Sequence, residues 1–241
     1  MVNLTIDGRN VQAEAGRTVL QTARDNKIDI PTLCYHEGVP AYGACRLRIV
    51  SIERHGRERL VVSCLYPVEE GLTVKTSTPR VDGVRRMVLD LLLARCPDSD
   101  VVRGLAKRYG VEKSSFRPES GNNKCILCAL CTRVCRDTVG VSAISLVNRG
   151  IDRKVATPFE TFSESCIACG SCAFVCPTGA ITVRDEGDTR VIIMPHVTME
   201  FKLKQCPTCG RYWAPERQLA FMRRQAGLAE DFYDKCPDCR D

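Results

Sequence analysis

The chain has 241 residues, of which 16 are cysteine and 27% are charged, and its formal net charge is +6. This length allows two or three small domains, each of them marginal in stability without reinforcement by bound metal or disulfides. Metal sites made of four thiolates carry a net negative charge that offsets the excess of lysine and arginine, and no basic stripe is interleaved with aromatic residues, so the composition does not indicate nucleic-acid binding.

The cysteines lie mostly in C-x2-C groups. Disulfide frameworks are typical of secreted chains, yet residues 1–7 lead directly into an alternating strand pattern, without a basic and apolar leader. The longest apolar run, residues 87–94, contains Asp90 and is too short to span a bilayer. We therefore expect a cytoplasmic chain without a membrane span, in which dense cysteine indicates metal binding.

Residues 1–78 predict a small β-rich domain. Apolar residues alternate on both sides of an Asp7-Gly8 turn, a helix is expected over 18–26, and strands are expected over 47–49, 60–62 and 72–74. A hairpin, a helix and then returning strands are the order expected of a β-grasp fold. The loop after the helix carries Cys34 and Cys45.

Residues 79–117 predict a helical connector. Thr78 can cap a first helix that ends at Cys96-Pro97, and a second helix is expected over 99–109. The spacing predicts one apolar packing stripe on the first helix, formed by Val84, Met87, Val88, Leu91 and Leu92. Cys96 belongs to no ligand set and is expected to pack as a small hydrophobic residue.

Residues 118–195 contain an internal repeat with the spacing C-x2-C-x2-C-x3-C. Its copies are Cys125, Cys128, Cys131 and Cys135, then Cys166, Cys169, Cys172 and Cys176. Three cysteines at this spacing wrap one face of a [4Fe–4S] cubane, and the fourth ligates the other cluster. The alternative is a pair of zinc sites, but zinc prefers two separate C-x2-C pairs to four cysteines in one run.

The crossed pattern predicts the ligands of two [4Fe–4S] clusters. We expect Cys125, Cys128, Cys131 and Cys176 around the first cluster, and Cys166, Cys169, Cys172 and Cys135 around the second. Small residues between these ligands, among them Ala129, Ala168 and Gly170, let backbone N–H groups approach the sulfurs.

Residues 196–241 form a cysteine-bounded tail with the ligand candidates Cys206, Cys209, Cys236 and Cys239. This pattern resembles a zinc ribbon or a rubredoxin, and spacing alone cannot name the metal, because both use four thiolates in a tetrahedron. An amphipathic helix predicted over 215–228 favours structural zinc over rubredoxin-type iron.

Three segments of the N-terminal domain resemble a known family: Pro-Thr-Leu-Cys-Tyr-His-Glu at 31–37, Tyr-Gly-Ala-Cys-Arg at 42–46 and Ser-Cys-Leu-Tyr-Pro-Val-Glu-Glu-Gly at 63–71. They look like the plant-type [2Fe–2S] domain of the complex I large iron–sulfur subunit. The diaphorase small subunit of NAD-linked [NiFe] hydrogenases has the same domain, as do related subunits of [FeFe] hydrogenases and formate dehydrogenases. The dicluster repeat resembles the same relatives, so the likeness covers about residues 1–195.

The resemblance implies [2Fe–2S] ligands at Cys34, Cys45, position 48 and Cys64, but position 48 is Arg48. Three thiolates remain where the cluster needs four ligands, and a guanidinium offers donors only. Two interpretations stay open: a cluster with Arg48 or another non-cysteine ligand, which the intact surroundings slightly favour, or an empty domain used for docking. The His/Cys3-ligated cluster of the relatives is expected to be missing, because residues 95–109 hold only Cys96 and no histidine.

The sequence thus predicts an α+β chain in four parts: a β-grasp ferredoxin-like domain (1–78), a helical connector (79–117), a dicluster ferredoxin-like domain (118–195) and a zinc-ribbon tail (196–241). No Gly-rich phosphate loop follows a strand, so we expect a non-catalytic electron-transfer subunit. The resemblance implies two partners, an NAD(P)H-handling flavoprotein and a catalytic hydrogenase or dehydrogenase subunit, in an assembly that could bifurcate electrons. The alternatives are a free ferredoxin-like carrier or redox sensor, and an assembly scaffold with structural clusters.

Overall fold

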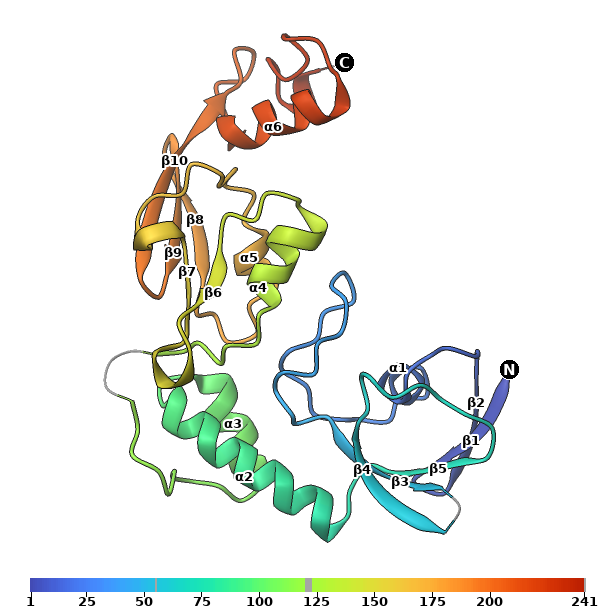
Figure 1. The fold of residues 1–241 in the computed structure, drawn as a ribbon. Helices are drawn as coiled ribbons and strands as arrows, with labels where there is room; N and C mark the ends of the chain where they lie inside the picture. Colours follow the sequence, from blue (N-terminus) through green and yellow to red (C-terminus); the bar gives the residue numbers. More distant parts are fainter. Residues whose placement is uncertain (55, 120–122, 241) are drawn as a thin grey trace. The chain divides into compact units, whose positions relative to one another are not determined.

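The structure is a computed structural model, and it describes residues 1–54, 56–119 and 123–240. It has mixed α and β structure, as predicted, and divides into two compact units, Met1–Cys128 and Ala129–Asp241 (Figure 1). Within the described ranges, no helix has both the length and the apolar composition needed to cross a membrane.

The first unit begins with a five-stranded sheet in the order β2-β1-β5-β3-β4. Its strands are β1 (Val2–Ile6), β2 (Arg9–Ala13), β3 (Ile49–Arg54), β4 (Arg57–Val62) and β5 (Leu72–Lys75). β1 pairs antiparallel with β2 across the predicted turn and parallel with β5, which itself pairs antiparallel with β3. β3 begins two residues later than the sequence predicts, because Leu47 and Arg48 still belong to a turn.

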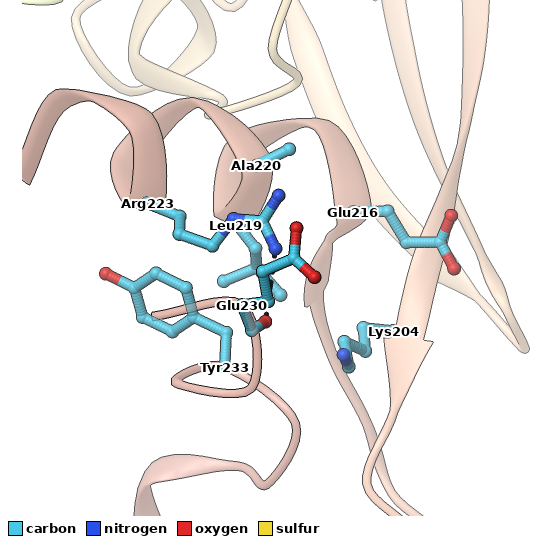
Figure 2. Close-up of a pocket in the computed structure, with 7 residues that line it drawn as sticks. All are labelled: Lys204, Glu216, Leu219, Ala220, Arg223, Glu230 and Tyr233. Carbon is cyan, nitrogen blue, oxygen red and sulfur yellow. Dashed lines mark hydrogen bonds between the residues drawn. The ribbon is translucent and has the colours of Figure 1, made fainter. Parts of the chain in front are cut away.

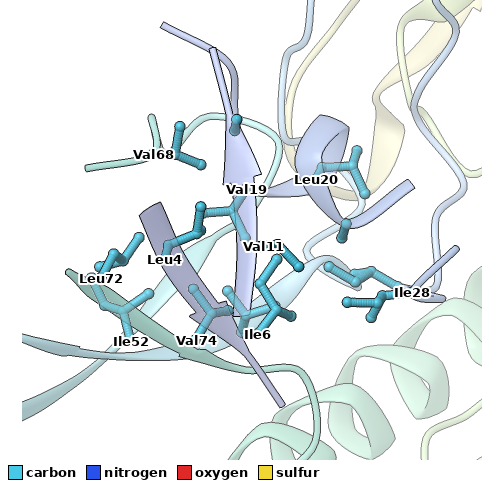
Figure 3. Close-up of a cluster of buried hydrophobic side chains, with 14 of the residues drawn as sticks. Leu4, Ile6, Val11, Val19, Leu20, Ile28, Ile52, Val68, Leu72 and Val74 are labelled. Carbon is cyan, nitrogen blue, oxygen red and sulfur yellow. The ribbon is translucent and has the colours of Figure 1, made fainter. Parts of the chain in front are cut away.

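Helix α1 (Val19–Asp25) covers the apolar face of this sheet (Figure 3). A capping box starts the helix, since Thr18 accepts a hydrogen bond from the Gln21 N–H and the Gln21 side chain accepts one from the Thr18 N–H. The core contains these labelled residues among others: Leu4, Ile6, Val11, Val19, Leu20, Ile28, Ile52, Val68, Leu72 and Val74. The long segment between α1 and β3 carries Cys34 and Cys45 at the edge of this core.

The connector consists of α2 (Pro79–Arg95) and α3 (Asp100–Arg108), which pack against each other. Thr78 and Ser99 cap them as N-cap residues, and Cys96 is fully buried. The predicted packing stripe is wrong. The buried residues of α2 are Val81, Arg85, Leu89 and Leu93. Met87 and Leu91, which the stripe included, are 54% and 49% exposed.

The second unit builds short elements around the cysteine repeat. Its helical turns are α4 (Leu130–Arg133), the π-helical η1 (Val134–Thr138), η2 (Gly150–Asp152), η3 (Pro158–Glu160), α5 (Ser171–Phe174) and η4 (Pro237–Cys239). Its strands are β6 (Ser145–Val147), β7 (Lys154–Ala156), β8 (Thr182–Glu186), β9 (Thr189–Met194), β10 (Val197–Gln205) and β11 (Tyr212–Pro215). β6 pairs with β7, and the other four strands form a sheet in the order β11-β10-β9-β8.

Strand β10 links the repeat to the tail. Its first part, Val197–Lys202, pairs with β9, and its last residues, Leu203–Gln205, pair with β11. Helix α6 (Glu216–Ala226) follows β11, buries Leu219 and ends at Gly227, which adopts the left-handed conformation that glycine favours at a helix C-terminus. The tail therefore continues a sheet that begins within the cysteine repeat.

Candidate metal centres

The two copies of the cysteine repeat have the same unusual backbone. Leu127 and Ala129 have φ of 52° and 60°, and the equivalent Ala168 and Gly170 have φ of 60° and 77°. Left-handed residues that alternate with right-handed or extended ones turn successive N–H groups toward one point, which favours an anion there. Both copies then enter a short helix, α4 or α5, directly after the second left-handed residue.

Four of the eight predicted cluster ligands line one cavity of the second unit. They are Cys135, Cys166, Cys169 and Cys172. Cys135 comes from the π-helical turn of the first copy, whereas the other three come from the second copy. The rest of the lining is mainly apolar and includes Ile144, Ile167, Ile192, Met194 and Met199. The fold thus places a thiol of one copy beside three thiols of the other.

Burial disfavours thiolates in this cavity. It raises the pKa of Cys135 and Cys166, and burial together with the charges of Cys169 and Cys166 raises the pKa of Cys172 to about 12. The Ala143 N–H partly compensates by donating to the Sγ of Cys135 at 3.2 Å. Four thiolates are therefore stable here only with a positive core between them, which bound iron would supply.

Two arginines that no sequence motif marks hold the cluster loop of the second copy. Arg190 donates to the Ala168 carbonyl at 3.2 Å and pairs with Asp185. Arg217, from α6 in the tail, donates to the Cys166 carbonyl at 3.2 Å and stacks over the Phe162 ring at 5.0 Å. Arg217 also pairs with Glu164 at 2.8 Å, so each guanidinium reaches the ligand loop as one half of an ion pair.

The other four predicted cluster ligands are divided between the two units. Cys125 and Cys128 lie in the first unit, and Cys131 and Cys176 lie in the second. Cys128 and Cys131 are buried, whereas Cys125 and Cys176 are partly exposed. In the first unit, the Cys96 thiol donates to the Cys125 carbonyl at 3.3 Å, so Cys96 supports the backbone of a predicted ligand.

In the N-terminal domain, Cys34, Cys45 and Cys64 are all buried, and so is Arg48. Arg48 Nη2 donates to Cys34 Sγ at 2.6 Å, and the Cys45 N–H donates to the same sulfur at 3.2 Å. A hydrogen bond from Cys34, reinforced by the Arg48 charge, lowers the pKa of Cys45 to about 4. Hydrogen bonding to Cys45 and burial raise the pKa of Cys34, and burial raises that of Cys64.

The tail cysteines form a compact group. The sulfurs of Cys206, Cys209, Cys236 and Cys239 lie within 4.8 Å of one another, and Cys209 Sγ is 3.8 Å from Cys236 Sγ. A tetrahedral ion with metal–sulfur bonds of about 2.3 Å separates its ligands by about 3.8 Å, so these residues fit one ion. Backbone N–H groups of Cys236 and Cys209 lower the pKa of Cys206 to about 6, which favours the ligating thiolate form.

A separate polar hollow lies between α6 and the chain that follows it (Figure 2). Its lining residues are Lys204, Glu216, Leu219, Ala220, Arg223, Glu230 and Tyr233. Lys204 already pairs with Asp234 at 2.6 Å, and Arg223 donates to the Glu230 carbonyl at 3.1 Å. These contacts occupy the Lys204 ammonium and the Arg223 guanidinium within the tail itself.

Comparison with protein families finds iron–sulfur domains in two parts of the chain. Residues 1–79 match the family described as a 2Fe-2S iron-sulfur cluster binding domain, and residues 160–182 match the 4Fe-4S binding domain. The second match contains Cys166, Cys169, Cys172 and Cys176.

Several curated proteins are similar to this chain. NADP-reducing hydrogenase subunit HndD of Solidesulfovibrio fructosivorans is 36% identical over 211 residues, and the mitochondrial NADH-ubiquinone oxidoreductase 78 kDa subunit of Neurospora crassa is 32% identical over 206 residues. Each alignment covers 75% of this chain, but only 36% and 27% of the respective relative. The chain thus spans about a quarter to a third of the length of these relatives.

A solved structure extends the likeness to three dimensions. The chain is similar to a chain of the "Crystal structure of NAD+-reducing [NiFe]-hydrogenase in the H2-reduced state", with a TM-score of 0.57 and 28% identity. The match covers 65% of this chain and 74% of that one. Together these matches confirm the resemblance to complex I-type and hydrogenase-type subunits that the sequence indicates.

Proposed function

The chain carries 2Fe–2S-type and 4Fe–4S-type domains and is homologous to subunits of NAD(P)-linked oxidoreductases, and we propose that it is an electron-transfer subunit of such a complex. In this role it relays electrons between a flavoprotein that handles NAD(P)H and a catalytic subunit of hydrogenase or formate dehydrogenase type. The chain performs no catalysis of its own. An assembly of this kind could also bifurcate electrons.

The observation that carries the proposal is the cavity that joins Cys135 to Cys166, Cys169 and Cys172. This is the mixed ligand set that two interleaved cubanes require. We assign the second [4Fe–4S] cluster to these four residues and the first to Cys125, Cys128, Cys131 and Cys176. Each cluster would exchange single electrons, and the chain's own contribution is to exclude water, hold the thiolates and present backbone N–H groups to them.

We also propose an assignment of the four parts of the chain and of the metal in its tail. Residues 1–78 form a β-grasp ferredoxin-like domain, residues 79–117 the connector, residues 118–195 the dicluster domain and residues 196–241 a ribbon-like tail. Structural zinc on Cys206, Cys209, Cys236 and Cys239 fits the compact sulfur group, although rubredoxin-type iron uses the same geometry. Such a metal would fold the tail and present a surface to a partner. A cytoplasmic complex without nucleic acid is the setting that this assignment implies.

Metal analysis of the anaerobically purified chain, combined with EPR, tests the cluster assignment. Two cubanes predict about eight irons per chain, with one zinc in addition. A content below about six irons contradicts the dicluster assignment.

A second experiment tests the relay. We expect the chain to co-purify with a flavoprotein and its cubanes to be reduced when NADH or NADPH is added to that complex. Cubanes that stay oxidised in the complex would favour an assembly scaffold. A stable monomer that accepts electrons from many donors would favour a free carrier.

A further inference from the structure

Arg48 lies at the position where the resemblance to 2Fe–2S domains implies a cluster ligand, and its side chain is buried, as are the three remaining thiols. Arg48 is 0% exposed, and its Nη2 is 2.6 Å from Cys34 Sγ. Its guanidinium carbon lies 5.3 Å from the centre of the Tyr35 ring, within the range of a cation–π contact. The side chain therefore points inward, into the cysteine group, and not to solvent.

The backbone around Arg48 holds it in this position. The Arg85 side chain of α2 donates to the carbonyls of Leu47 and Ile49, on either side of Arg48, at 3.1 and 2.8 Å. The Arg48 carbonyl accepts from the Ser63 N–H at 2.9 Å, next to Cys64. The buried guanidinium is thus built into the fold through contacts from α2 and from the loop that carries the third cysteine.

The residues present do not fit a [2Fe–2S] cluster. Two tetrahedral irons that share two sulfides need four protein ligands, and three thiols supply three. A guanidinium stays protonated and has no lone pair to offer as the fourth ligand. An iron that joined Nη2 to Cys34 Sγ, with bonds of about 2.0 and 2.3 Å, would separate these atoms by about 3.5 Å. Nη2 instead lies 2.6 Å from Cys34 Sγ, as the donor of a hydrogen bond to it.

A fully buried cation needs compensation, because its desolvation is costly. Here Nη2 has sulfur as its acceptor, whereas Nε and Nη1 are buried without a hydrogen-bond partner in the part of the chain that the structure describes. The positive charge is therefore held by the cysteine sulfurs and the Tyr35 ring. The iron core of a [2Fe–2S] cluster would likewise place positive charge among these sulfurs.

We propose that the guanidinium of Arg48 takes the place of the iron–sulfur core in the N-terminal domain, which therefore folds without a [2Fe–2S] cluster. The match to the 2Fe–2S family then reflects the fold of residues 1–79 and three of the four ligand positions. The domain then carries no electrons itself.

EPR of the full-length, anaerobically reconstituted and reduced chain tests this directly. Reduced [2Fe–2S] clusters relax slowly, so their signal persists at temperatures at which the signals of reduced cubanes have broadened away. We expect no such signal from the wild-type chain and no iron beyond that of the cubanes. A persistent signal with about two extra irons per chain overturns the proposal. The cubane signals at lower temperature report separately on the proposed electron-transfer role.

Substitution at position 48 provides the complementary test. Arg48→Cys restores the fourth thiol, and we expect it to gain about two irons and the persistent signal. Arg46→Cys is the matched control, since Arg46 is exposed in the same turn and should give no gain. A gain of iron and of the persistent signal in both variants, or in neither variant, contradicts the role assigned to Arg48. If Arg48→Cys does not yield soluble protein, the wild-type spectrum and iron content still decide the question.

Discussion

Cys135 is the residue that most directly distinguishes crossed from uncrossed cluster ligation. It follows the first three cysteines of its own copy in sequence, yet it lines a cavity with three cysteines of the other copy. We expect Cys135→Ala to remove the second cluster and keep the first, so that the iron content falls from about eight to about four. Iron analysis measures the fall in iron content, and EPR shows which cluster remains.

The control for Cys135→Ala is Cys96→Ala. Cys96 is also buried and belongs to neither ligand set, and its thiol donates to the carbonyl of Cys125, a predicted ligand of the first cluster. Its loss should therefore leave the second cluster intact. If Cys135→Ala instead left the second cluster intact and removed the first, the ligation would be uncrossed.

Arg217 brings a positive charge to the loop of the second cluster, through its bond to the Cys166 carbonyl. A nearby cation stabilises the reduced, more negative state of a cluster. We therefore expect Arg217→Gln to lower the reduction potential of the second cluster by on the order of 50 mV, close to a tenfold change in a one-electron equilibrium. Potentiometric titration followed by EPR measures the shift.

Arg224→Gln removes the same charge from an exposed position of the same helix and should leave that potential unchanged. An equal shift in both variants would mean that net charge, and not the contact with the Cys166 loop, sets the potential.

The cysteines could be selected from the sequence because the spacing of metal ligands along the chain is fixed by the geometry of the metal centre. The arginines that contact backbone carbonyls far along the chain could not be selected in this way. Arg217 reaches a carbonyl 51 residues earlier in the chain, and Arg85 reaches one 38 residues earlier. Nothing local marks such a residue, since arginine is common on exposed helix faces. The burial of Arg48 could be suspected, because the resemblance implies a cysteine at its position.

At the scale of elements, α2 shows why apolar spacing alone misplaced a helix face. Three consecutive leucines, Leu91 to Leu93, fit more than one stripe, and the predicted one excluded positions occupied by arginine. The buried face instead repeats every four residues through Val81, Arg85, Leu89 and Leu93. Arg85 belongs to that face because two backbone carbonyls accept its hydrogen bonds, which a pattern of apolar residues cannot reveal.

Arg85 is therefore expected to stabilise the first unit. Arg85→Met keeps much of the packing but leaves the carbonyls of Leu47 and Ile49 without these donors. Losing the partner of a buried polar group costs about 1–3 kcal/mol, and we expect Arg85→Met to lower the free energy of unfolding by about 2–4 kcal/mol in total. Chemical denaturation followed by circular dichroism measures the difference.

Arg86→Met is the control, because Arg86 is the next residue of the same helix and is exposed. Its effect should stay within about 0.5 kcal/mol, as is usual for surface substitutions. Similar losses in both variants would show that helix α2, and not the contact with the two carbonyls, accounts for the change.

At the scale of the whole molecule, the sequence indicated the number of cysteine groups but not how the tail connects to the repeat. The cysteine spacing suggested a boundary near 195, whereas β10 pairs with β9 through Val197–Lys202 and with β11 through Leu203–Gln205. Strand pairing joins residues that are distant in the chain, so it leaves no signal in the spacing of ligands. The continuous strand and the Arg217 contact are two separate connections from the tail to the second cluster loop.

These connections predict that the tail metal influences the second cluster. The chain between α6 and Cys236 contacts α6 at Glu230, whose carbonyl accepts from Arg223, and α6 carries Arg217. We expect removal of the metal to loosen this chain and, with it, α6. We expect Cys236→Ala to lose one metal ion per chain and to lower the potential of the second cluster in the same direction as Arg217→Gln. The double variant should show no further shift, because both changes remove one contact.

Metal analysis and potentiometric EPR on the same samples measure both effects, with the second cluster identified by its loss in Cys135→Ala. Lys204→Gln is the control, because it breaks the Lys204–Asp234 ion pair of the tail without touching a thiol. It should change neither metal content nor potential. Loss of the metal with an unchanged potential would show that α6 keeps Arg217 at the Cys166 carbonyl by itself, through Leu219 and the pairing of β10 with β11.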